Sequence, residues 1–296
     1  MEYRSVGMLG RRDTVRIGFV DHHLNNYHAD KFLALLRGPL NDLGAEVTGA
    51  WESDPVGDDW CAKNLVPRLE SAKEVAEQSD AIIILAPDNI DDHLKLCREV
   101  LPFGKPTAID KALAFNLRDA KEIVDLAKRH STPITSSSAL AFAVELEDML
   151  PEITKTPSEV WATGMGEWKN YGLHTLSMVL RIMGPGIKRL ADTGTDSSRM
   201  VTLDYGNGRV GFVTVRWSDN MWEAFPWVLG IRLSHEKFLQ TTIRDYDGFY
   251  ANLMRHVVQF FKEGTGGFPG ELAMELVAVL ESADKSRALD GSWVKL

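Results

Sequence analysis

Apolar and polar positions follow two different patterns along this chain, and the first pattern occupies residues 15–135. Short apolar runs recur there, each separated from the next by a stretch with helical spacing. One run, Asp80–Pro87, holds its apolar residues in a continuous block, as a strand buried on both faces requires. The predicted strands are Val15–Val20, Glu46–Trp51, Asp80–Pro87, Thr107–Ile109 and Ile134–Thr135. This strand–helix alternation predicts an α/β doubly wound parallel sheet.

The segments between these strands carry apolar residues three and four positions apart, which is the spacing of an amphipathic helix. Asn116 is a favourable N-cap, and an apolar stripe continues from Leu117 to Ala127. The other predicted helices run from about Ala29 to Gly38, from Pro67 to Gln78 and from Asp91 to Leu101.

The second half of the chain contains consecutive strand-like runs without helices between them. Gly206–Gly208 separates two of these runs and is a strong hairpin signal. Strands that follow one another directly indicate an antiparallel sheet. The predicted strands are Val160–Thr163, Met200–Tyr205, Val210–Trp217, Trp227–Leu233 and Phe238–Ile243, and two helices, Gly248–Glu263 and Glu271–Leu289, end the chain. We therefore expect an α/β domain over residues 1–135 and an α+β domain with an open antiparallel sheet over residues 136–296.

Composition narrows the class of protein. The chain has 296 residues, 44% of them hydrophobic and 25% charged, with a net charge of −9. That charge and the lack of a basic run argue against nucleic-acid binding, which depends on phosphate neutralisation. No apolar stretch approaches the roughly 20 residues of a membrane span, and the N-terminus lacks the apolar core of a secretion signal. Cys61 and Cys97 have no metal-type spacing, so we expect buried thiols and a cytoplasmic protein.

The segment Phe103–Asn116 places Lys111 just beyond the end of a predicted strand. Ligands of open α/β sheets bind beyond the carboxyl ends of the strands. A lysine there can donate a proton, bind an anion or remain a solvated loop cation.

Several motifs follow one another in a characteristic order. They are Ala81–His93 with its Pro87 and His93, then Gly104–Ala112 with Lys111, then Asn170–His174, and finally Ala283–Ser286 with Gly291–Val294. In this order the chain resembles the Gfo/Idh/MocA family, the relatives of glucose–fructose oxidoreductase and inositol 2-dehydrogenase. The resemblance extends from Val15 to Leu296.

The resemblance implies a fold, a cofactor and a reaction. Family members bind NAD or NADP on a Rossmann-type first domain and oxidise a sugar or polyol hydroxyl. Their second domain commonly packs against a partner subunit through its sheet, so we expect a dimer or tetramer. The final helix is expected to pack back on the first domain. By the same resemblance, Lys111 and His174 are the proton-handling residues, and Asn170 stands where the family commonly carries aspartate.

The resemblance also identifies residues that would contact the cofactor. Glu52 ends the second strand, where it can accept hydrogen bonds from an adenosine ribose and favour NAD over the phosphorylated form. Pro87, Asn89 and His93 match the wall beside the nicotinamide, next to Lys111. His93 is also placed to mark a helix start, and Asn170 to serve as a helix N-cap.

The loop after the first strand departs from the family pattern. A dinucleotide fingerprint needs glycines for a tight turn and for close approach to the pyrophosphate. Residues 21–28 contain no glycine, and Asp21 would repel the pyrophosphate while His22 and His23 partly offset that charge. The loop either binds NAD in an adjusted pose or has lost it. Ala112, which replaces a proline of the family signature, is a further departure.

Three histidines of this loop, His22, His23 and His28, invite comparison with a metal site. Adjacent histidines point apart in most backbones, and no carboxylate pair completes the set at a diagnostic spacing. We therefore expect no metal.

Two functions remain open. The first is an NAD(P)-dependent oxidoreductase, with NAD as the favoured cofactor, that acts on a sugar, polyol or related hydroxy compound. The second is a non-redox relative that has lost normal dinucleotide binding and that binds a small molecule or catalyses a lyase or hydrolase step. The specific substrate does not follow from the sequence.

Overall fold

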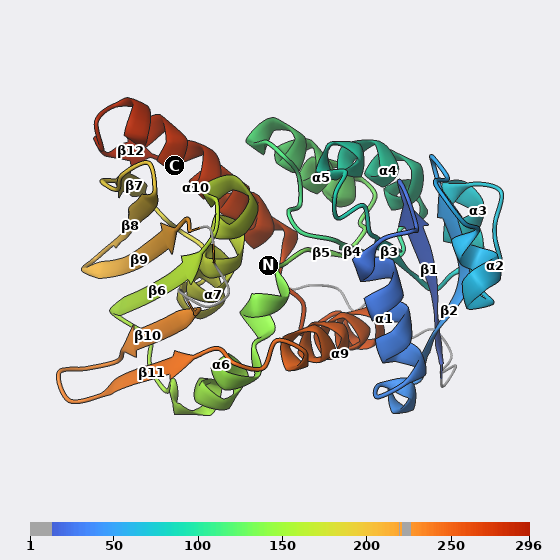
Figure 1. Ribbon diagram of the computed structural model, residues 1–296, viewed down its shortest axis with the longest axis horizontal. Coiled ribbons are helices and arrows are strands. Elements are labelled where there is room, and N and C mark those ends of the chain that lie inside the picture. The colour runs from blue at the N-terminus through green and yellow to red at the C-terminus, as the bar shows by residue number, and fades with distance from the viewer. Residues whose placement is uncertain (1–13, 219, 221–225) are drawn as a thin grey trace.

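Two β-sheets lie at the two ends of the molecule's longest axis, with helices packed between them (Figure 1). The computed structural model describes residues 14–218, 220 and 226–296. Within that part of the chain, no helix is both long and apolar enough to cross a membrane.

The first sheet has five parallel strands in the order β2-β1-β3-β4-β5. All four residues of β3 are buried, as its continuous apolar run predicts. The strands are β1 (Val15–Asp21), β2 (Ala45–Glu52), β3 (Ala81–Ile84), β4 (Thr107–Ile109) and β5 (Ile134–Thr135). The predicted parallel sheet is confirmed.

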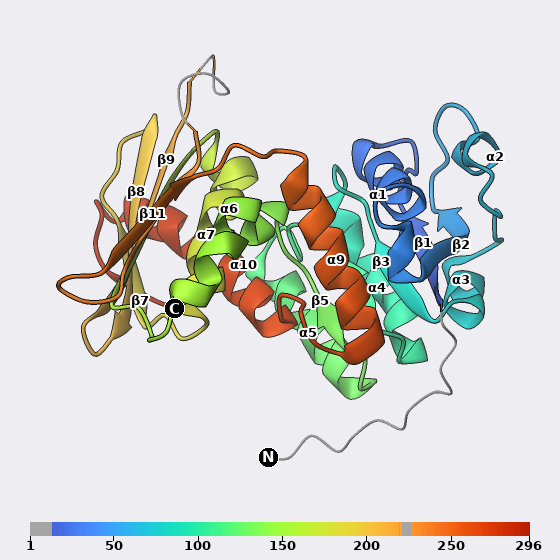
Figure 2. The ribbon, with the colours of Figure 1, turned by 90° about the horizontal axis from the view of Figure 1, so that it is seen from below.

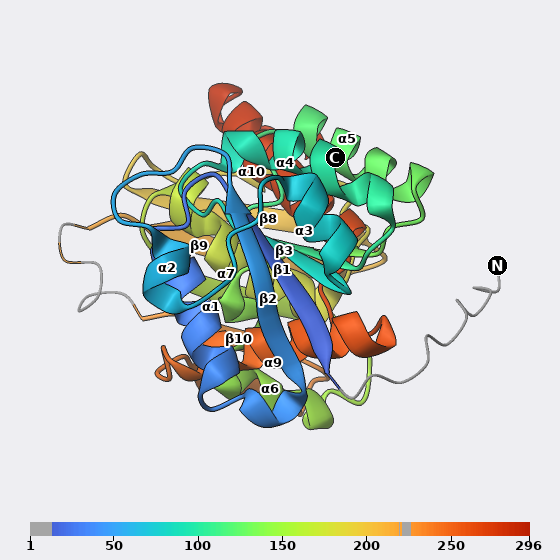
Figure 3. The ribbon, with the colours of Figure 1, turned by 90° about the vertical axis from the view of Figure 1, so that its right-hand side faces the viewer.

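Helices cover both faces of this sheet, and Figure 3 shows α1 and α3 on opposite sides of β1 and β2. Asn26 caps α1 by accepting a hydrogen bond from Ala29 N–H, and Asn116 caps α5 in the same way. The helices are α1 (Tyr27–Arg37), α2 (Trp60–Asn64), α3 (Ala72–Gln78), α4 (His93–Val100) and α5 (Leu117–Arg129).

The helix predicted over Pro67–Gln78 is wrong in its first part. Ser71 is the N-cap of α3, so the helix begins at Ala72. Residues 67–69 instead lie beside β2, where Ala50 N–H bonds to Pro67 and Leu69 N–H bonds to Ala50. Backbone pairing with a strand has therefore replaced the local helical preference of these residues.

The second sheet has seven strands in the order β11-β10-β6-β9-β8-β7-β12. The strands β6 and β9 run parallel, whereas the other neighbouring pairs are antiparallel. The sheet is thus mixed but mostly antiparallel, and the hairpin predicted at Gly206–Gly208 joins β8 to β9. The strands are β6 (Glu159–Met165), β7 (Arg189–Asp192), β8 (Ser198–Gly206), β9 (Arg209–Arg216), β10 (Val228–Arg232), β11 (Phe238–Thr242) and β12 (Val294–Lys295).

The helices of the second half lie between the two sheets (Figure 2). They are α6 (Val144–Met149), α7 (Leu173–Met183), α9 (Gly248–Glu263) and α10 (Gly270–Ala288). α10 contacts β7 and α7 on one side and α5 on the other, and α9 contacts α1. We keep a domain boundary after residue 135 as a proposal.

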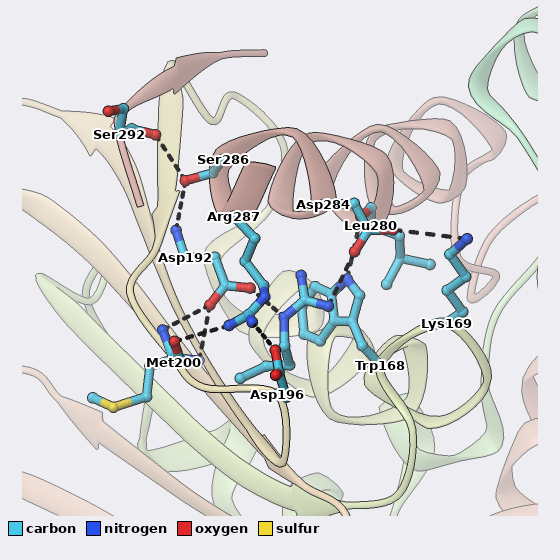
Figure 4. Close-up of polar contacts among 12 residues, drawn as sticks. Trp168, Lys169, Asp192, Asp196, Met200, Leu280, Asp284, Ser286, Arg287 and Ser292 are labelled. Carbon is cyan, nitrogen blue, oxygen red and sulfur yellow. Dashed lines mark hydrogen bonds and ion pairs between the residues drawn. The ribbon is translucent and has the colours of Figure 1, made fainter. Parts of the chain in front are cut away.

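A buried ion pair attaches α10 to the second sheet (Figure 4). The Asp192 carboxylate, at the end of β7, is fully buried and accepts hydrogen bonds from Arg199 and from the N–H groups of Gly194 and Met200. Arg199 also bonds to Asp284 of α10 at 3.0 Å, and its guanidinium lies 4.9 Å from the ring centre of Trp168. Sheet, helix and the segment at Trp168 are therefore held together by one charge cluster.

Replacing Asp192 by alanine should lower the free energy of unfolding by about 2–4 kcal/mol, because a buried Arg199 would lose its main partner. Urea unfolding followed by circular dichroism measures this loss. The matched control is Asp125→Ala, which removes the exposed Lys121–Asp125 pair of α5, and we expect it to cost less than about 1 kcal/mol. Equal losses in the two variants would contradict the anchoring role of Asp192.

Candidate functional site

A cavity of about 830 Å³ lies between the carboxyl ends of the first-sheet strands and the helices of the second half. Its lining includes the predicted residues Pro87, Lys111, Asn170 and His174. Four other predicted residues, Asp21, His22, His23 and Glu52, lie outside this lining. The structure thus brings the expected chemical groups together and separates them from the expected adenosine end.

Lys111 follows β4 and extends toward the end of β3. Its Nζ lies 3.5 Å from the carbonyl oxygen of Pro87, and its backbone N–H donates to Asp110 at 2.8 Å. The peptide bond between Lys111 and Ala112 is cis. The ammonium group stands at the cavity wall, where it can contact an oxygen of a bound molecule.

His28 and Asp110 form a buried pair that lines the same cavity as Lys111. His28 Nδ1 is hydrogen-bonded to the Asp110 carboxylate, and because a carboxylate only accepts, Nδ1 carries the proton. Burial alone would raise the pKa of Asp110, but His28 and Lys111 outweigh it and hold that pKa below its usual value. The sequence analysis considered His28 only as a possible metal ligand and missed its pairing with Asp110. The position of Asp110 next to Lys111 was the signal that could have indicated a buried partner for this carboxylate.

His174 lies in the first turn of α7, and its ring faces the cavity. Its Nδ1 is 2.7 Å from Ser138 Oγ. Burial lowers the pKa of the imidazole to about 3, with Lys111 and His28 acting in the same direction and Asp110 opposing them. At neutral pH the ring is therefore neutral, and one of its nitrogens can accept a proton.

Asn170 does not cap α7, contrary to expectation. A π-helical turn, η6 (Trp168–Gly172), precedes α7, and the Asn170 amide donates to Glu167 at 3.0 Å. Two residues of this turn contact α10 (Figure 4). Trp168 Nε1 donates a hydrogen bond to the backbone carbonyl of Leu280, and Lys169 Nζ lies 3.9 Å from a carboxylate oxygen of Asp284. The turn carries Asn170 to the cavity edge.

The predicted nicotinamide wall is only partly present. Pro87 is buried and lines the cavity. His93 is fully buried as the first residue of α4, and its two ring nitrogens face the carbonyl oxygens of Leu85 and Leu113, so it has a structural role. Asn89 lies outside the cavity lining.

The loop after β1 is closed by its own polar groups. Asp21 is fully buried, and its carboxylate accepts hydrogen bonds from the N–H groups of His22, His23 and Ala86 and from the Asn26 side chain. Asp21, His23 and Asn26 have the spacing of the three fingerprint glycines, G-x-G-x-x-G. Burial raises the pKa of Asp21 to about 7, while the four hydrogen bonds oppose the rise.

Glu52 is likewise bonded within the protein. Its side chain is 1% exposed. One carboxylate oxygen accepts the Leu24 N–H at 2.6 Å, and the other accepts a hydrogen bond from Arg68 at 2.9 Å. A ribose can reach Glu52 only if the loop moves away from it.

These contacts test the fit of a dinucleotide. The cavity beside Pro87 and Lys111 has room for a nicotinamide-sized group. The pyrophosphate–adenosine end does not fit in the usual pose, for two reasons. The Leu24 N–H and the Glu52 carboxylate bond to each other, and the buried carboxylate of Asp21 lies beneath the loop. Binding in that pose would require this loop to open.

The expectation that the adjacent histidines point apart is wrong. The rings of His22 and His23 lie side by side, with centres 4.1 Å apart. Both rings face the loop after β2, where Asp54 is located.

Comparison with known proteins indicates an oxidoreductase class for the part of the chain that contains the first sheet. Residues 16–137 match the family model described as "Oxidoreductase family, NAD-binding Rossmann fold". For residues 16–137 this match confirms the resemblance to the Gfo/Idh/MocA oxidoreductases seen in the motifs. No curated protein sequence matches the chain.

Solved structures share the fold over nearly the whole chain. A probable dehydrogenase from Thermotoga maritima has a TM-score of 0.80 at 15% identity, covering 95% of this chain and 98% of its own. GenD2 from gentamicin A biosynthesis, solved with NAD, has a TM-score of 0.77 at 13% identity, covering 99% of each chain. Myo-inositol dehydrogenase from Lactobacillus casei, solved with NAD(H) and myo-inositol, has a TM-score of 0.74 at 15% identity, covering 96% of this chain and 97% of its own. At these identities the likeness establishes the fold.

The lowered pKa of His174 predicts a pH dependence of stability. Below about pH 6.5 the unfolded chain binds a proton at this histidine, whereas the folded protein does not until about pH 3. Stability is therefore lost as the pH falls through this window. Between about pH 7 and about pH 4.5, the free energy of unfolding of wild type should fall by about 1–2 kcal/mol more than that of His174→Gln. This figure includes a discount for the contact of the ring with solvent in the cavity.

Urea unfolding of both proteins across this range measures the difference. Parallel pH profiles for wild type and His174→Gln would mean that His174 is as easily protonated in the folded protein as in the unfolded chain.

Proposed function

We propose that the protein is an enzyme, an NAD-dependent oxidoreductase that acts on a hydroxyl group of a sugar, polyol or related hydroxy compound. The family of residues 16–137 supports the reaction class. The convergence of Lys111 and His174 on one cavity supports the chemistry. A myo-inositol dehydrogenase among the structural neighbours favours a polyhydroxylated substrate.

The two residues have complementary roles in this proposal. Lys111 binds the reacting oxygen and stabilises negative charge that develops on it. His174 is neutral and accepts the hydroxyl proton, with Ser138 orienting its ring. The buried Asp110 fixes the Lys111 backbone through their hydrogen bond. A bound nicotinamide cofactor supplies the hydride acceptor or donor.

A second candidate is favoured by the closed loop at Asp21–Asn26. In this alternative the same cavity binds a small hydroxylated molecule, and Lys111 and His174 move a proton without hydride transfer. The internal hydrogen bond between Leu24 and Glu52 supports it, because that contact occupies groups a dinucleotide would use.

Cofactor binding separates the two candidates. We expect calorimetric titration of the full chain with NADH to show binding at sub-millimolar to millimolar concentration, weaker than for a glycine loop because the Leu24–Glu52 contact must break. NADH binding weaker than NADPH binding would contradict the preference for NAD. No binding of either nucleotide at millimolar concentration would favour the second candidate.

In the redox proposal, Lys111→Ala should lower turnover on a substrate found by screening polyols and sugars, by on the order of 10²–10⁴-fold. Reduced nicotinamide absorbance measures the turnover. The control is Lys121→Ala on α5, which is exposed and outside the cavity lining. Undiminished turnover in Lys111→Ala would remove this residue from the catalytic site.

We propose a cytoplasmic location, because a reducing compartment is consistent with the free thiols Cys61 and Cys97.

We also propose that copies of this chain associate through the second sheet. Large apolar side chains are exposed on this sheet and just beyond it, namely Met200, Phe212, Trp217 and Phe238. Sedimentation velocity should give a dimer or tetramer, and Phe212→Lys should shift it toward the monomer. A wild-type monomer at micromolar concentration would contradict the proposal.

A further inference from the structure

Two loops at the carboxyl edge of the first sheet bring two histidines and an aspartate together. His22 and His23 follow β1, and Asp54 follows β2. One potential ligand atom from each residue lies within 4.8 Å of the others. We propose that His22, His23 and Asp54 form a binding site for one divalent transition-metal ion of the zinc type.

The hydrogen bond of His23 determines which nitrogen is available. His23 Nδ1 is bonded to the backbone carbonyl of Asp54. A carbonyl oxygen can only accept, so Nδ1 carries the hydrogen, and in the neutral ring Nε2 presents a lone pair. That Nε2 lies 3.9 Å from a carboxylate oxygen of Asp54. Two electron-rich atoms thus face each other, an arrangement that a positive charge between them would stabilise.

His22 is arranged in the same way. Its Nδ1 is 2.8 Å from Ser53 Oγ and 3.3 Å from a carboxylate oxygen of Asp92. A proton on Nδ1 satisfies these acceptors and leaves Nε2, which is 3.8 Å from the same Asp54 oxygen, as the ligand atom. Metal-binding histidines commonly donate their other N–H to a carbonyl, carboxylate or water. His23 has a carbonyl partner, and His22 has the Ser53 hydroxyl with the Asp92 carboxylate nearby.

The backbone holds the ligands in place before any ion arrives. The N–H groups of His22 and His23 both donate to the buried Asp21 carboxylate, at 2.7 and 3.2 Å. The backbones of the two loops also bond to each other. Ser53 N–H donates to the backbone carbonyl of Asp21, and Asp54 N–H donates to that of His22, both at 3.0 Å. Ligand loops fixed in this way lose little further freedom on binding.

The donor set indicates the class of ion. Two imidazole nitrogens with one carboxylate suit zinc and its first-row neighbours, whereas magnesium and calcium prefer oxygen ligands. In tetrahedral zinc sites, ligand atoms are about 3.4 Å apart. The two separations from Asp54 therefore need to shorten by about half an ångström, and the two histidine ligand atoms, which lie within 4.8 Å of each other, also need to approach. Asp54 is 65% exposed, so it can make this movement and solvent can occupy the remaining coordination positions.

The proposed ion would lie on the loop that replaces the fingerprint glycines. This placement does not depend on the proposed oxidoreductase activity, since metal binding is measurable without substrate or cofactor. The competing explanation for the cluster is protonation, in which imidazolium rings of His22 and His23 pair with the Asp54 carboxylate and no metal ion is bound.

The test is a calorimetric titration of the full chain, stripped with a chelator and dialysed, with zinc chloride near neutral pH. We expect one zinc ion per chain with a micromolar or tighter dissociation constant. His23→Ala and Asp54→Asn should each weaken binding by at least about tenfold, and Asp92→Asn by about tenfold through loss of its contact with His22. His235→Ala changes an exposed histidine of the turn between β10 and β11, and the zinc affinity of this variant should stay that of wild type.

A second measurement keeps the test independent of stability. Cobalt(II) added to the stripped protein should give the visible absorption of a four-coordinate site, and His22→Ala should lose it while its circular dichroism stays native. Wild type that binds no zinc below millimolar concentration overturns the proposal and leaves the proton explanation. Equal zinc affinity in His23→Ala, or magnesium binding tighter than zinc, also overturns it.

Discussion

A buried carboxylate at the end of β1 organises the ligand-facing edge of the first sheet. Asp21 bonds to its own loop, to the N–H of Ala86 after β3 and to Asn26, the N-cap of α1. Removing a carboxylate from water is costly unless hydrogen bonds replace its hydration. Four N–H donors do so here, and in doing so they fix the path of the loop. The position of α1 relative to β1 and β3, the closure of the loop and the pairing of two histidines all follow from this constraint.

The consequence is a cleft with two different ends. At the open end, Lys111, His174 and the His28–Asp110 pair surround a cavity in which a neutral imidazole and an ammonium stand together, an arrangement suited to moving a proton from a hydroxyl. At the other end, Glu52, which was predicted to contact an adenosine ribose, accepts a hydrogen bond from the Leu24 N–H. The family match of residues 16–137 favours an NAD-dependent oxidoreductase, whereas the closed loop favours proton transfer without hydride transfer. Cofactor binding is the property that decides between these two functions.

Much of the fold was predictable because burial imposes periodicity. The parallel sheet, the hairpin at Gly206–Gly208 and the cap at Asn116 were predicted and are present, since each depends on residues close in sequence. The first part of the helix predicted from Pro67 was wrong because residues 67–69 pair with β2 instead. The parallel pairing of β6 with β9 was missed because strand order depends on packing between distant segments. Asn170 was misassigned because a π-helical turn precedes α7, whose N-cap is Gly172 instead, two residues later.

By itself the sequence determined the strands of the parallel sheet and most of the longer helices. It also determined that Lys111 stands beyond a strand end and that the loop after β1 lacks glycine. These properties are written in local patterns of burial and backbone freedom. Only the tertiary structure decided that His28 meets Asp110, 82 residues away, and that Leu24 N–H meets Glu52, 28 residues away. It also brought Asp54 to His22 and His23. Contacts of this kind depend on the paths of loops relative to one another, and no periodicity in the chain records those paths.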